Sequence, residues 1–167
     1  AGKSTTIRML CGILNPTSGD ALVAGYSVME QPDDVKRNIG YMSQRFSLYD
    51  ELTVEENINF FGGVYGLKGN KLDERKKWVL KIANLNNKEN ILTGSLPGGI
   101  KQRLALGTAV IHNPKIVFLD EPTSGVDPIS RRGFWELINE LSENGTTVFV
   151  TTHYLEEAEF CNNIILI

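Results

Sequence analysis

Apolar residues occur along this chain in two patterns that alternate from one end to the other. Runs at 115–120 and 146–152 are typical of buried strands, and 39–44 indicates another short strand. A shorter run at 21–25 and the apolar residues at 163–167 indicate two further strands, the second of which continues to the last residue. Strands that alternate with helical segments predict an α/β fold with a largely parallel sheet.

Between about 49 and 96 the apolar residues instead recur at helical spacing. Thr53 and Glu56 form a capping-box pattern, which predicts that an amphipathic helix begins there and covers 54–67. A second helix with the same spacing is expected over 72–85. We interpret this block as a helical subdomain inserted into the α/β core.

Three more helices are indicated by their start and stop signals. One begins near Lys3, directly after a glycine. A Gly-Gly turn within 96–114 leads into another, which we expect to be amphipathic. Asp127 and Pro128 are suited to the start of a helix that runs to about Glu143.

The composition indicates the general class of protein but says little about its function. The 167 residues suffice for one domain with a sizeable core, and 41% hydrophobic with 22% charged residues is ordinary for a globular domain. A net charge of -3 argues against broad electrostatic binding of nucleic acid. Cys11 and Cys161 form no metal-binding pattern, which favours a reduced, cytoplasmic setting. No apolar run approaches the roughly 20 residues that span a bilayer, so we expect any membrane link to involve a partner or a segment outside the chain.

The first five residues carry the most informative motif. Ala1-Gly2-Lys3-Ser4-Thr5 matches the second half of G-x-x-x-x-G-K-[ST], a phosphate-binding loop that runs into a helix. In such a loop Lys3 supplies a positive charge to the β- and γ-phosphates of a nucleotide, and Ser4 offers its hydroxyl to Mg²⁺. We therefore expect the chain to be a fragment that lacks the first half of the loop and the strand before it, and that binds nucleotide weakly without them. The alternative is a chance Gly-Lys-Ser-Thr sequence at a helix start.

Four polar residues lie at or just after the ends of predicted strands, where ligands of open α/β sheets bind. Asp120 and Glu121 end the strand at 115–120; the first suits a hold on Mg²⁺, and the second suits a base that orients and polarises an attacking water. His153 follows the next strand and can contact a terminal phosphate, whereas Gln44 can contact Mg²⁺ or water. The alternatives are acidic residues that only end a strand, a structural histidine and a surface glutamine.

A glycine-containing turn, Leu96-Pro97-Gly98-Gly99-Ile100, precedes one of the predicted helices. Backbone N–H groups exposed at a helix start attract anions, so this turn is a second candidate for contact with phosphate. The alternative is a linker that only begins the helix.

These motifs, in this order, resemble the ATP-binding domain of ABC transporters, and the resemblance covers essentially the whole chain. The branch that looks most similar is that of bacterial multidrug-export ATPases that carry two such domains in one chain. The matching segments are the Walker A end at Gly2-Lys3-Ser4-Thr5, the Q-loop at Gln44, the signature position at 96–100, Walker B at 116–121, the D-loop at 124–127 and the switch histidine at His153.

The resemblance implies a P-loop NTPase core of the α/β class, with a mostly parallel sheet and an inserted ABC-type helical subdomain. Residues 1–167 are then one ABC ATPase domain fragment. Residues 1–48 and 115–167 are expected to form its RecA-like core. Residues from about 49 to 114 are expected to form the helical subdomain together with the signature helix.

The resemblance also implies cofactors and roles for individual residues. The cofactors are ATP and Mg²⁺, and the metal is held by Ser4, Gln44 and Asp120. Glu121 activates water and His153 positions the γ-phosphate, with Gln44 as a third member of the catalytic set. The expected contacts to ATP come from Gly2, Lys3, Ser4, Thr5, Leu96, Pro97, Gly98, Gly99, Ile100 and Asp127.

Two kinds of protein partner follow from the resemblance. One is a second ABC ATPase domain in a head-to-tail dimer, whether homodimer, heterodimer or tandem, with ATP between the Walker motifs of one domain and the signature of the other. The second is a transmembrane permease that docks near 44–53 and the helical block, so that hydrolysis powers export. The chain is then expected at the cytoplasmic face of the cell membrane, held there by this partner, with no nucleic acid bound.

Two residues depart from the family's signature. Pro97 replaces a serine, which removes a hydroxyl and a backbone N–H, and Ile100 replaces a glutamine. Two rival functions stay open: a non-transport ABC ATPase that acts on ribosomes or DNA, and the regulatory half of an asymmetric dimer. The lack of a long coiled-coil insertion argues against the first, and the presence of Lys3, Glu121 and His153 argues against the second.

Overall fold

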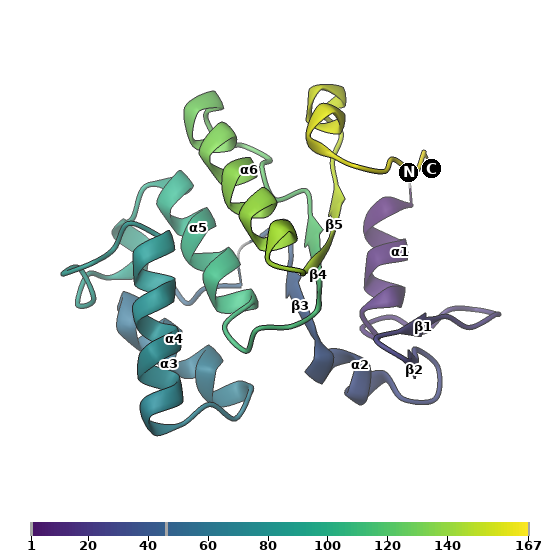
Figure 1. The fold of residues 1–167 in the computed structure, drawn as a ribbon, viewed down its shortest axis with the longest axis horizontal. Helices are drawn as coiled ribbons and strands as arrows, with labels where there is room; N and C mark the ends of the chain where they lie inside the picture. Colours follow the sequence, from purple (N-terminus) through teal and green to yellow (C-terminus); the bar gives the residue numbers. More distant parts are fainter. Residues whose placement is uncertain (1, 46, 167) are drawn as a thin grey trace.

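Strand β4 (Ile116–Asp120) lies between β3 (Ile39–Met42) and β5 (Thr147–Thr151) in a parallel sheet (Figure 1). The computed structural model describes residues 2–45 and 47–166. The register places Asp120 beside Thr151, and Leu119 beside Met42. The carboxyl ends of all three strands therefore lie at one edge of the sheet, as the parallel arrangement predicted from the sequence requires.

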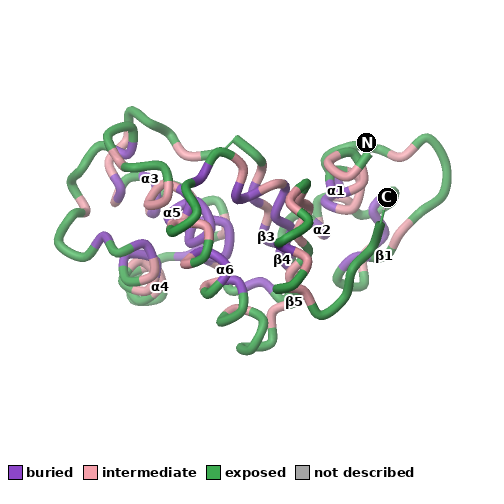
Figure 2. Tube along the Cα trace, turned by 90° about the horizontal axis from the view of Figure 1, so that it is seen from above, coloured by how far each residue is buried: buried purple, intermediate pink, exposed green. Residues whose placement is uncertain are grey.

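Helices cover both faces of this sheet, and a small hairpin lies beside it. Figures 1 and 2 show α1 on one side of the sheet and α5 and α6 on the other, with α3 and α4 beyond α5. The remaining elements are α1 (Lys3–Leu10), β1 (Leu22–Val23), β2 (Tyr26–Ser27), α2 (Pro32–Asn38), α3 (Val54–Val64), α4 (Gly69–Ile82), α5 (Gly98–Ala109), α6 (Pro128–Glu143) and the 3-10 turns η1 (Thr93–Ser95) and η2 (Leu155–Phe160).

Successive residues of β4 are buried on opposite faces of the sheet. Val117 and Leu119 belong to a core cluster with residues of α5 and α6, including the buried Trp135. Phe118 belongs to a second cluster, formed with residues of α1 and α2 such as Ile7. Both faces of β4 are thus apolar, which explains why its sequence is a continuous apolar run rather than an alternating one.

Helices α3, α4 and α5 pack around a third apolar cluster, to which Ile58, Val79 and Leu104 belong. Thr53 begins α3 through the predicted capping box: its hydroxyl accepts from the Glu56 N–H, and the Glu56 carboxylate accepts from the Thr53 N–H. The helices of the middle block are confirmed, although α4 begins at Gly69, three residues earlier than expected.

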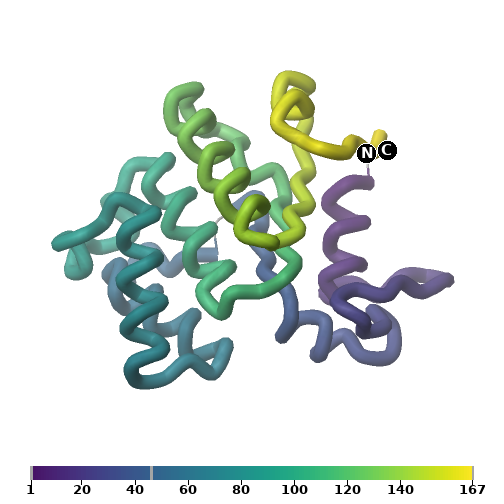
Figure 3. The backbone as a smooth tube through the Cα atoms, viewed as in Figure 1, coloured from purple at the N-terminus to yellow at the C-terminus, as the bar shows by residue number. Residues whose placement is uncertain are grey.

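Two of the predictions about these elements are wrong. Helix α5 is not amphipathic: Gln102 and residues 104–109 are all buried, because α5 lies between the middle block on one side and α6 and the sheet on the other. Residues 163–166 form no strand. They run as an irregular, exposed stretch near the start of α1 (Figure 3), and no strand of the described residues pairs with them. The last residue of that predicted strand, 167, lies outside the described residues.

Gly40 of β3 lets α5 approach the sheet closely. A Cβ atom at this position would lie 2.7 Å from the carbonyl oxygen of Ala109, which is the last residue of α5. Any other residue at position 40 would therefore push the end of α5 away from β3. None of the helices in 2–45 and 47–166 combines the length and the apolar character that crossing a membrane requires.

Candidate active site

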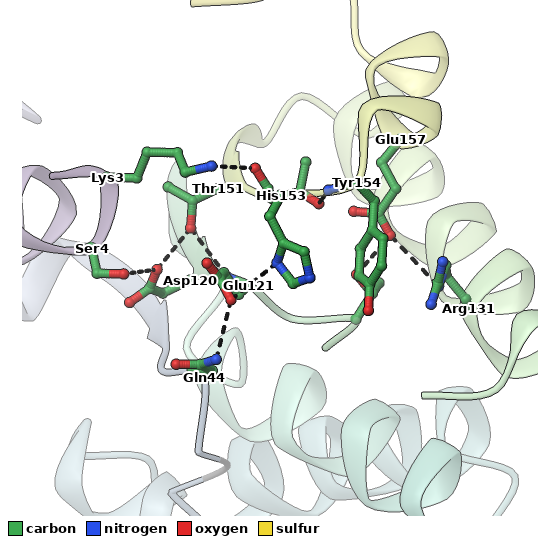
Figure 4. Close-up of polar contacts among 12 residues, drawn as sticks. Lys3, Ser4, Gln44, Asp120, Glu121, Arg131, Thr151, His153, Tyr154 and Glu157 are labelled. Carbon is green, nitrogen blue, oxygen red and sulfur yellow. Dashed lines mark hydrogen bonds and ion pairs between the residues drawn. The ribbon is translucent and has the colours of Figure 1, made fainter. Parts of the chain in front are cut away.

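The start of α1 is joined to the end of β4 by a buried carboxylate. The Ser4 hydroxyl donates to Oδ1 of Asp120 at 2.8 Å, and the Thr151 hydroxyl donates to the same oxygen at 2.7 Å (Figure 4). Asp120 is only 2% exposed. Two protein hydroxyls thus satisfy one oxygen of a buried acidic group, as burial of a charge requires.

Glu121 has an unusual backbone conformation that directs its side chain. Its φ of 47° lies in the left-handed region, which costs a residue with a side chain about 1–2 kcal/mol. The Glu121 N–H donates to the carbonyl oxygen of Thr151 at 3.0 Å and to its hydroxyl oxygen at 3.1 Å. These bonds stabilise the sharp turn of the chain where β4 ends.

The Glu121 carboxylate meets an amide and an imidazole from two other parts of the chain. Gln44 Nε2 donates to Glu121 Oε2 at 3.1 Å, and His153 Nδ1 lies 3.3 Å from the same oxygen (Figure 4). The Glu121 side chain is 20% exposed and that of His153 is 48% exposed, so water and a ligand can reach both. The structure therefore brings together the three residues that the sequence predicted to be catalytic.

Lys3 points toward the same edge of the sheet. Its ammonium donates to the carbonyl oxygen of Thr152 at 2.6 Å, just beyond the end of β5. Gly2 precedes α1 with a φ of 103°, a conformation that favours glycine, and Thr5 is exposed on the first turn. The predicted phosphate-binding residues thus surround the N-terminal end of α1, where the helix dipole is positive.

The predicted signature segment lies elsewhere. Pro97 precedes α5, and its carbonyl oxygen accepts from the N–H groups of Ile100 and Lys101, each at 3.0 Å. Leu96 and Ile100 pack against the apolar cluster of the middle block. Figures 1 and 2 show α1 and α5 on opposite sides of the sheet, so the structure does not bring residues 96–100, Gly98 and Gly99 included, together with the start of α1.

Asp127 begins α6 and is also separate from the carboxylate cluster. Its side chain accepts from the Ser130 N–H at 2.9 Å, as the sequence predicted for the start of this helix. Hydrogen bonding from Ser130 lowers the pKa of Asp127, so the group is ionised at neutral pH. Gly99 explains how closely α5 and α6 approach here, because a Cβ at that position would clash with the Ser130 side chain.

The sequence indicated neither the contact of Thr151 with Asp120 nor the buried Glu157 beyond the site. Thr151 was predicted only as a strand residue, although its place opposite Asp120 in the register now explains its contact. Behind His153, the buried Glu157 accepts from the Thr123 hydroxyl at 2.6 Å and lies 3.9 Å from Arg131. The Arg131 guanidinium also lies 4.1 Å from the centre of the Tyr154 ring. Thr151 could have been predicted from the sequence by aligning the two strands so that a threonine lies opposite Asp120.

The donor atoms suit a magnesium ion that is shared with a ligand. Among residues 2–45 and 47–166, no three His, Cys, Asp or Glu side chains gather into a metal site. Ser4, Asp120 and Gln44 instead offer a hydroxyl, a carboxylate and an amide oxygen, which are hard ligands. Proteins commonly bind Mg²⁺ through one or two such groups together with substrate phosphates, so these residues fit the predicted ion.

The family profile named ABC transporter matches residues 1–124. The chain belongs to the ABC transporter family. Among curated proteins, the probable multidrug ABC transporter ATP-binding protein YbhF of Escherichia coli strain K12 is 52% identical over 167 residues, covering 100% of this chain and 29% of that protein. The linearmycin resistance ATP-binding protein LnrL of Bacillus subtilis strain 168 is 39% identical over 165 residues, covering 98% of this chain and 53% of that protein. The chain thus spans about half or less of the length of these relatives.

Solved structures of ABC ATP-binding domains share the fold. The ATP-binding subunit of an ABC transporter matches with a TM-score of 0.82 and 29% identity, over 96% of this chain and 68% of that one. The ATP-binding cassette MJ0796, in a dimeric post-hydrolysis state bound to ADP and Pi, matches with a TM-score of 0.83 and 28% identity, over 95% and 73%. The predicted family, the α/β P-loop NTPase fold and the likeness to multidrug-export ATPases are confirmed. The division into core and helical subdomain and the roles of single residues stay predictions.

Proposed function

We propose that this ABC domain binds ATP with Mg²⁺ and hydrolyses it, and that hydrolysis drives export of a substrate through a transmembrane partner. The observation that carries the proposal is the meeting of Ser4, Asp120, Glu121, Gln44 and His153 at one sheet edge. A carboxylate with a neighbouring amide and imidazole, next to a cationic helix start, is suited to phosphoryl transfer to water.

Phosphate binding falls to the first turn of α1. Lys3 exchanges its contact with the Thr152 carbonyl for the β- and γ-phosphates, while N–H groups at the start of the helix donate to the same oxygens. Gly2 allows the loop to approach the phosphates closely, and Thr5 adds a hydroxyl. Because Lys3 already points to the edge where Asp120 and Glu121 lie, binding needs only a short movement of its side chain.

Ser4 and Gln44 hold Mg²⁺ through their oxygens, and Asp120 supports the ion from the buried end of β4. When bound, Mg²⁺ neutralises charge on the phosphate oxygens and orients the terminal phosphate. The hydrogen bond from Ser4 to Asp120 keeps both oxygen donors at the same place before the ion arrives. This arrangement explains why a serine stands next to the lysine of the loop.

Glu121 acts as the base. Its carboxylate accepts a hydrogen bond from the attacking water and takes up the proton as the oxygen bonds to phosphorus. Gln44 and His153 contact Oε2 of Glu121, which fixes its orientation; His153 also holds the γ-phosphate in place. As this bond forms, the bond between the γ-phosphorus and the oxygen that bridges to the β-phosphate breaks, and its electron pair leaves with ADP; the second product is inorganic phosphate.

The segment 96–100 serves the site of a second ABC domain rather than its own. It lies on the other side of the sheet from α1, so it reaches a nucleotide only across an interface. The dimer of the similar cassette MJ0796 supports pairing with a second domain. We propose a head-to-tail pair, whether the second domain is a copy, a different chain or a tandem domain. Pro97 supplies neither hydroxyl nor N–H, which leaves Gly98 and Gly99 to donate to phosphate, with Asp127 near the same interface.

The membrane partner docks on the middle block. We assign residues 1–48 and 115–167 to the RecA-like core and 49–114 to the helical subdomain, and we place the docking surface at 44–53 and α3; residue 46 of this stretch lies outside the described residues. The relatives YbhF, named a probable multidrug transporter protein, and LnrL, named a resistance protein, support a role in transport. The chain then works at the cytoplasmic face of the membrane, without nucleic acid.

The decisive experiment is Mg-ATP turnover of the full-length protein with Glu121→Gln. Loss of the base is expected to lower turnover on the order of 10²–10⁴-fold while ATP binding persists. Glu159→Gln is the matched control, because Glu159 is an exposed glutamate near the end of η2. Unchanged turnover in Glu121→Gln would show that Glu121 is not the base.

A further inference from the structure

We propose that Thr151 is a positioning residue for the hydrolysis proposed above, because its hydroxyl fixes the Asp120 carboxylate and the Glu121 backbone at the same time. This inference rests on the proposed function. Thr151 is the last residue of β5 and pairs directly with Asp120 in the parallel register. It therefore lies between the residue that supports the metal and the residue that serves as base (Figure 4).

The proton of the Thr151 hydroxyl has one possible direction. The Glu121 N–H can only donate, and it donates to the hydroxyl oxygen at 3.1 Å. The hydroxyl must therefore direct its own proton to Oδ1 of Asp120, which lies 2.7 Å away. The result is a chain of bonds that runs from the Glu121 backbone through Thr151 to Asp120, and such chains strengthen each member.

This chain fixes the orientation of the Asp120 carboxylate. Oδ1 accepts from Thr151 on one side and from the Ser4 hydroxyl on the other, at 2.7 and 2.8 Å. With two donors from different elements on the same oxygen, the carboxylate cannot rotate without breaking a bond in a site that is 2% exposed. Oδ2 is then the oxygen available to the cation.

The same hydroxyl stabilises the left-handed conformation of Glu121. At a φ of 47°, this residue needs compensation for its backbone strain, and its N–H is shared between two acceptors, both of which belong to Thr151. The turn held in this way directs the Glu121 carboxylate toward Gln44 and His153. Without the bond to the Thr151 hydroxyl, the Glu121 carboxylate would be less well oriented toward the attacking water.

Threonine suits this task better than other residues with a similar volume. Valine has the same shape but lacks the hydroxyl, so it loses both bonds. Serine keeps the hydroxyl but has more freedom about χ1, because it lacks the branch at Cβ. The positioning role therefore predicts that serine restores most of what valine removes, whereas a role in packing alone predicts the opposite order.

The experiment compares Thr151→Val and Thr151→Ser in the full-length protein, with Thr147→Val as the control. Thr147 lies at the other end of β5 and is exposed, so the same chemical change there leaves the site intact. We expect Thr151→Val to lower kcat about tenfold with KM for ATP changed by about twofold at most, and Thr151→Ser to stay within about threefold of the wild type. Hydrogen exchange of the peptide covering 120–126, measured without nucleotide, should rise in Thr151→Val only.

Each result decides a separate question. Wild-type kcat and unchanged exchange in Thr151→Val would overturn the positioning role and leave the proposed function in place. Equal losses in Thr151→Val and Thr151→Ser would overturn it as well, since the hydroxyl then does not matter. A wild-type protein without Mg-ATP turnover would overturn the proposed function, and the positioning role with it.

Discussion

The strand ends at the sheet edge and the start of α5 are both predicted to contact nucleotide, yet they are built in opposite ways. At the sheet edge, Ser4, Asp120 and Thr151 come from three elements and bond to one another. At the start of α5, Pro97 offers only a carbonyl oxygen, which its own helix uses. Hydrogen bonds between side chains organise the first region before any ligand binds, whereas Pro97 brings no donor to the second region. We refer to the sheet edge as the finished half of the predicted site and to the start of α5 as its unfinished half.

The far end of α5 shows how different the two ends of this helix are. Arg75 donates to the carbonyl oxygens of Val110 and Ile111 at 2.9 and 2.7 Å, where a cation also complements the helix dipole. His112 Nε2 lies 3.0 Å from the carbonyl oxygen of Ile39, and its ring stacks on Tyr65 at 3.5 Å. Side-chain bonds to backbone oxygens thus anchor the end of α5, whereas its start is held by apolar packing and by the 2.9 Å ion pair between Lys101 and Asp50.

In this comparison, the largest change is a loss of turnover when the Asp120 carboxylate, which Ser4 and Thr151 contact, is replaced. Asp120→Asn keeps the shape of the side chain but removes its charge, so the pairing with Ser4 and Thr151 weakens and the support for the metal is lost. Turnover should fall on the order of 10²–10³-fold, by analogy with the removal of one electrostatic contact to a transition state. Steady-state kinetics would measure it, with the exposed Asp73→Asn on α4 as the control. A loss below about threefold would contradict the role of Asp120.

A smaller effect is expected at the anchored end of α5, and it depends on pH. Burial lowers the pKa of His112 from 6.5 to about 4. In the unfolded chain the group titrates near its ordinary value, so between these pH values the unfolded state binds more protons. The contribution of neutral His112 to stability is therefore complete above about pH 6.5 and is lost as the pH falls toward 4. Between pH 7 and pH 5 the free energy of unfolding should fall by about 2 kcal/mol through this group.

Urea unfolding of the wild type and of His112→Phe at both pH values isolates this contribution of His112. Phenylalanine retains a flat ring beside Tyr65 but does not titrate. The decrease between pH 7 and pH 5 should therefore be about 2 kcal/mol smaller in the variant. Equal decreases in the free energy of unfolding of both proteins would show that protonation of His112 does not destabilise the fold.

The smallest effect is expected where the unfinished half is completed. Pro97→Ser restores a hydroxyl and an N–H at a position whose φ of -57° and ψ of 148° suit a serine that caps a helix. We expect turnover to rise about tenfold in the dimer, from a new donor to phosphate, and stability to rise by about 1 kcal/mol. Pro97→Ala, which restores the N–H alone, separates the two donors. If neither variant changes turnover, the backbone of Gly98 and Gly99 already suffices.

The sequence predicted the residues of the finished half better than their contacts. Asp120 and Glu121 follow a continuous apolar run, and such a run predicts a buried strand whose end faces ligands. Thr151 was not predicted because its role depends on the register between β4 and β5, a relation between residues far apart in sequence. The left-handed backbone of Glu121 also has no local signal, since glutamate rarely adopts it.

The predictions about the fold were wrong where they rested on apolar composition alone. Residues 163–167 have the composition of a strand, but a strand also needs a hydrogen-bonded neighbour, and none of the described residues supplies one. Helix α5 was expected to have a polar face, but tertiary packing buries Gln102 and every residue from 104 to 109. Helix α2 was missed, although Pro32 and the acidic residues after it are ordinary signals of a helix start.

The close approach at Gly40 has a mechanical consequence. Because the Ala109 carbonyl fills the space of a side chain at position 40, the end of α5 cannot tilt without displacing β3. Gln44, which holds the Glu121 carboxylate, follows two residues after β3 ends. A shift of the end of α5 would therefore displace β3 and, just beyond it, the amide of Gln44 that contacts Glu121.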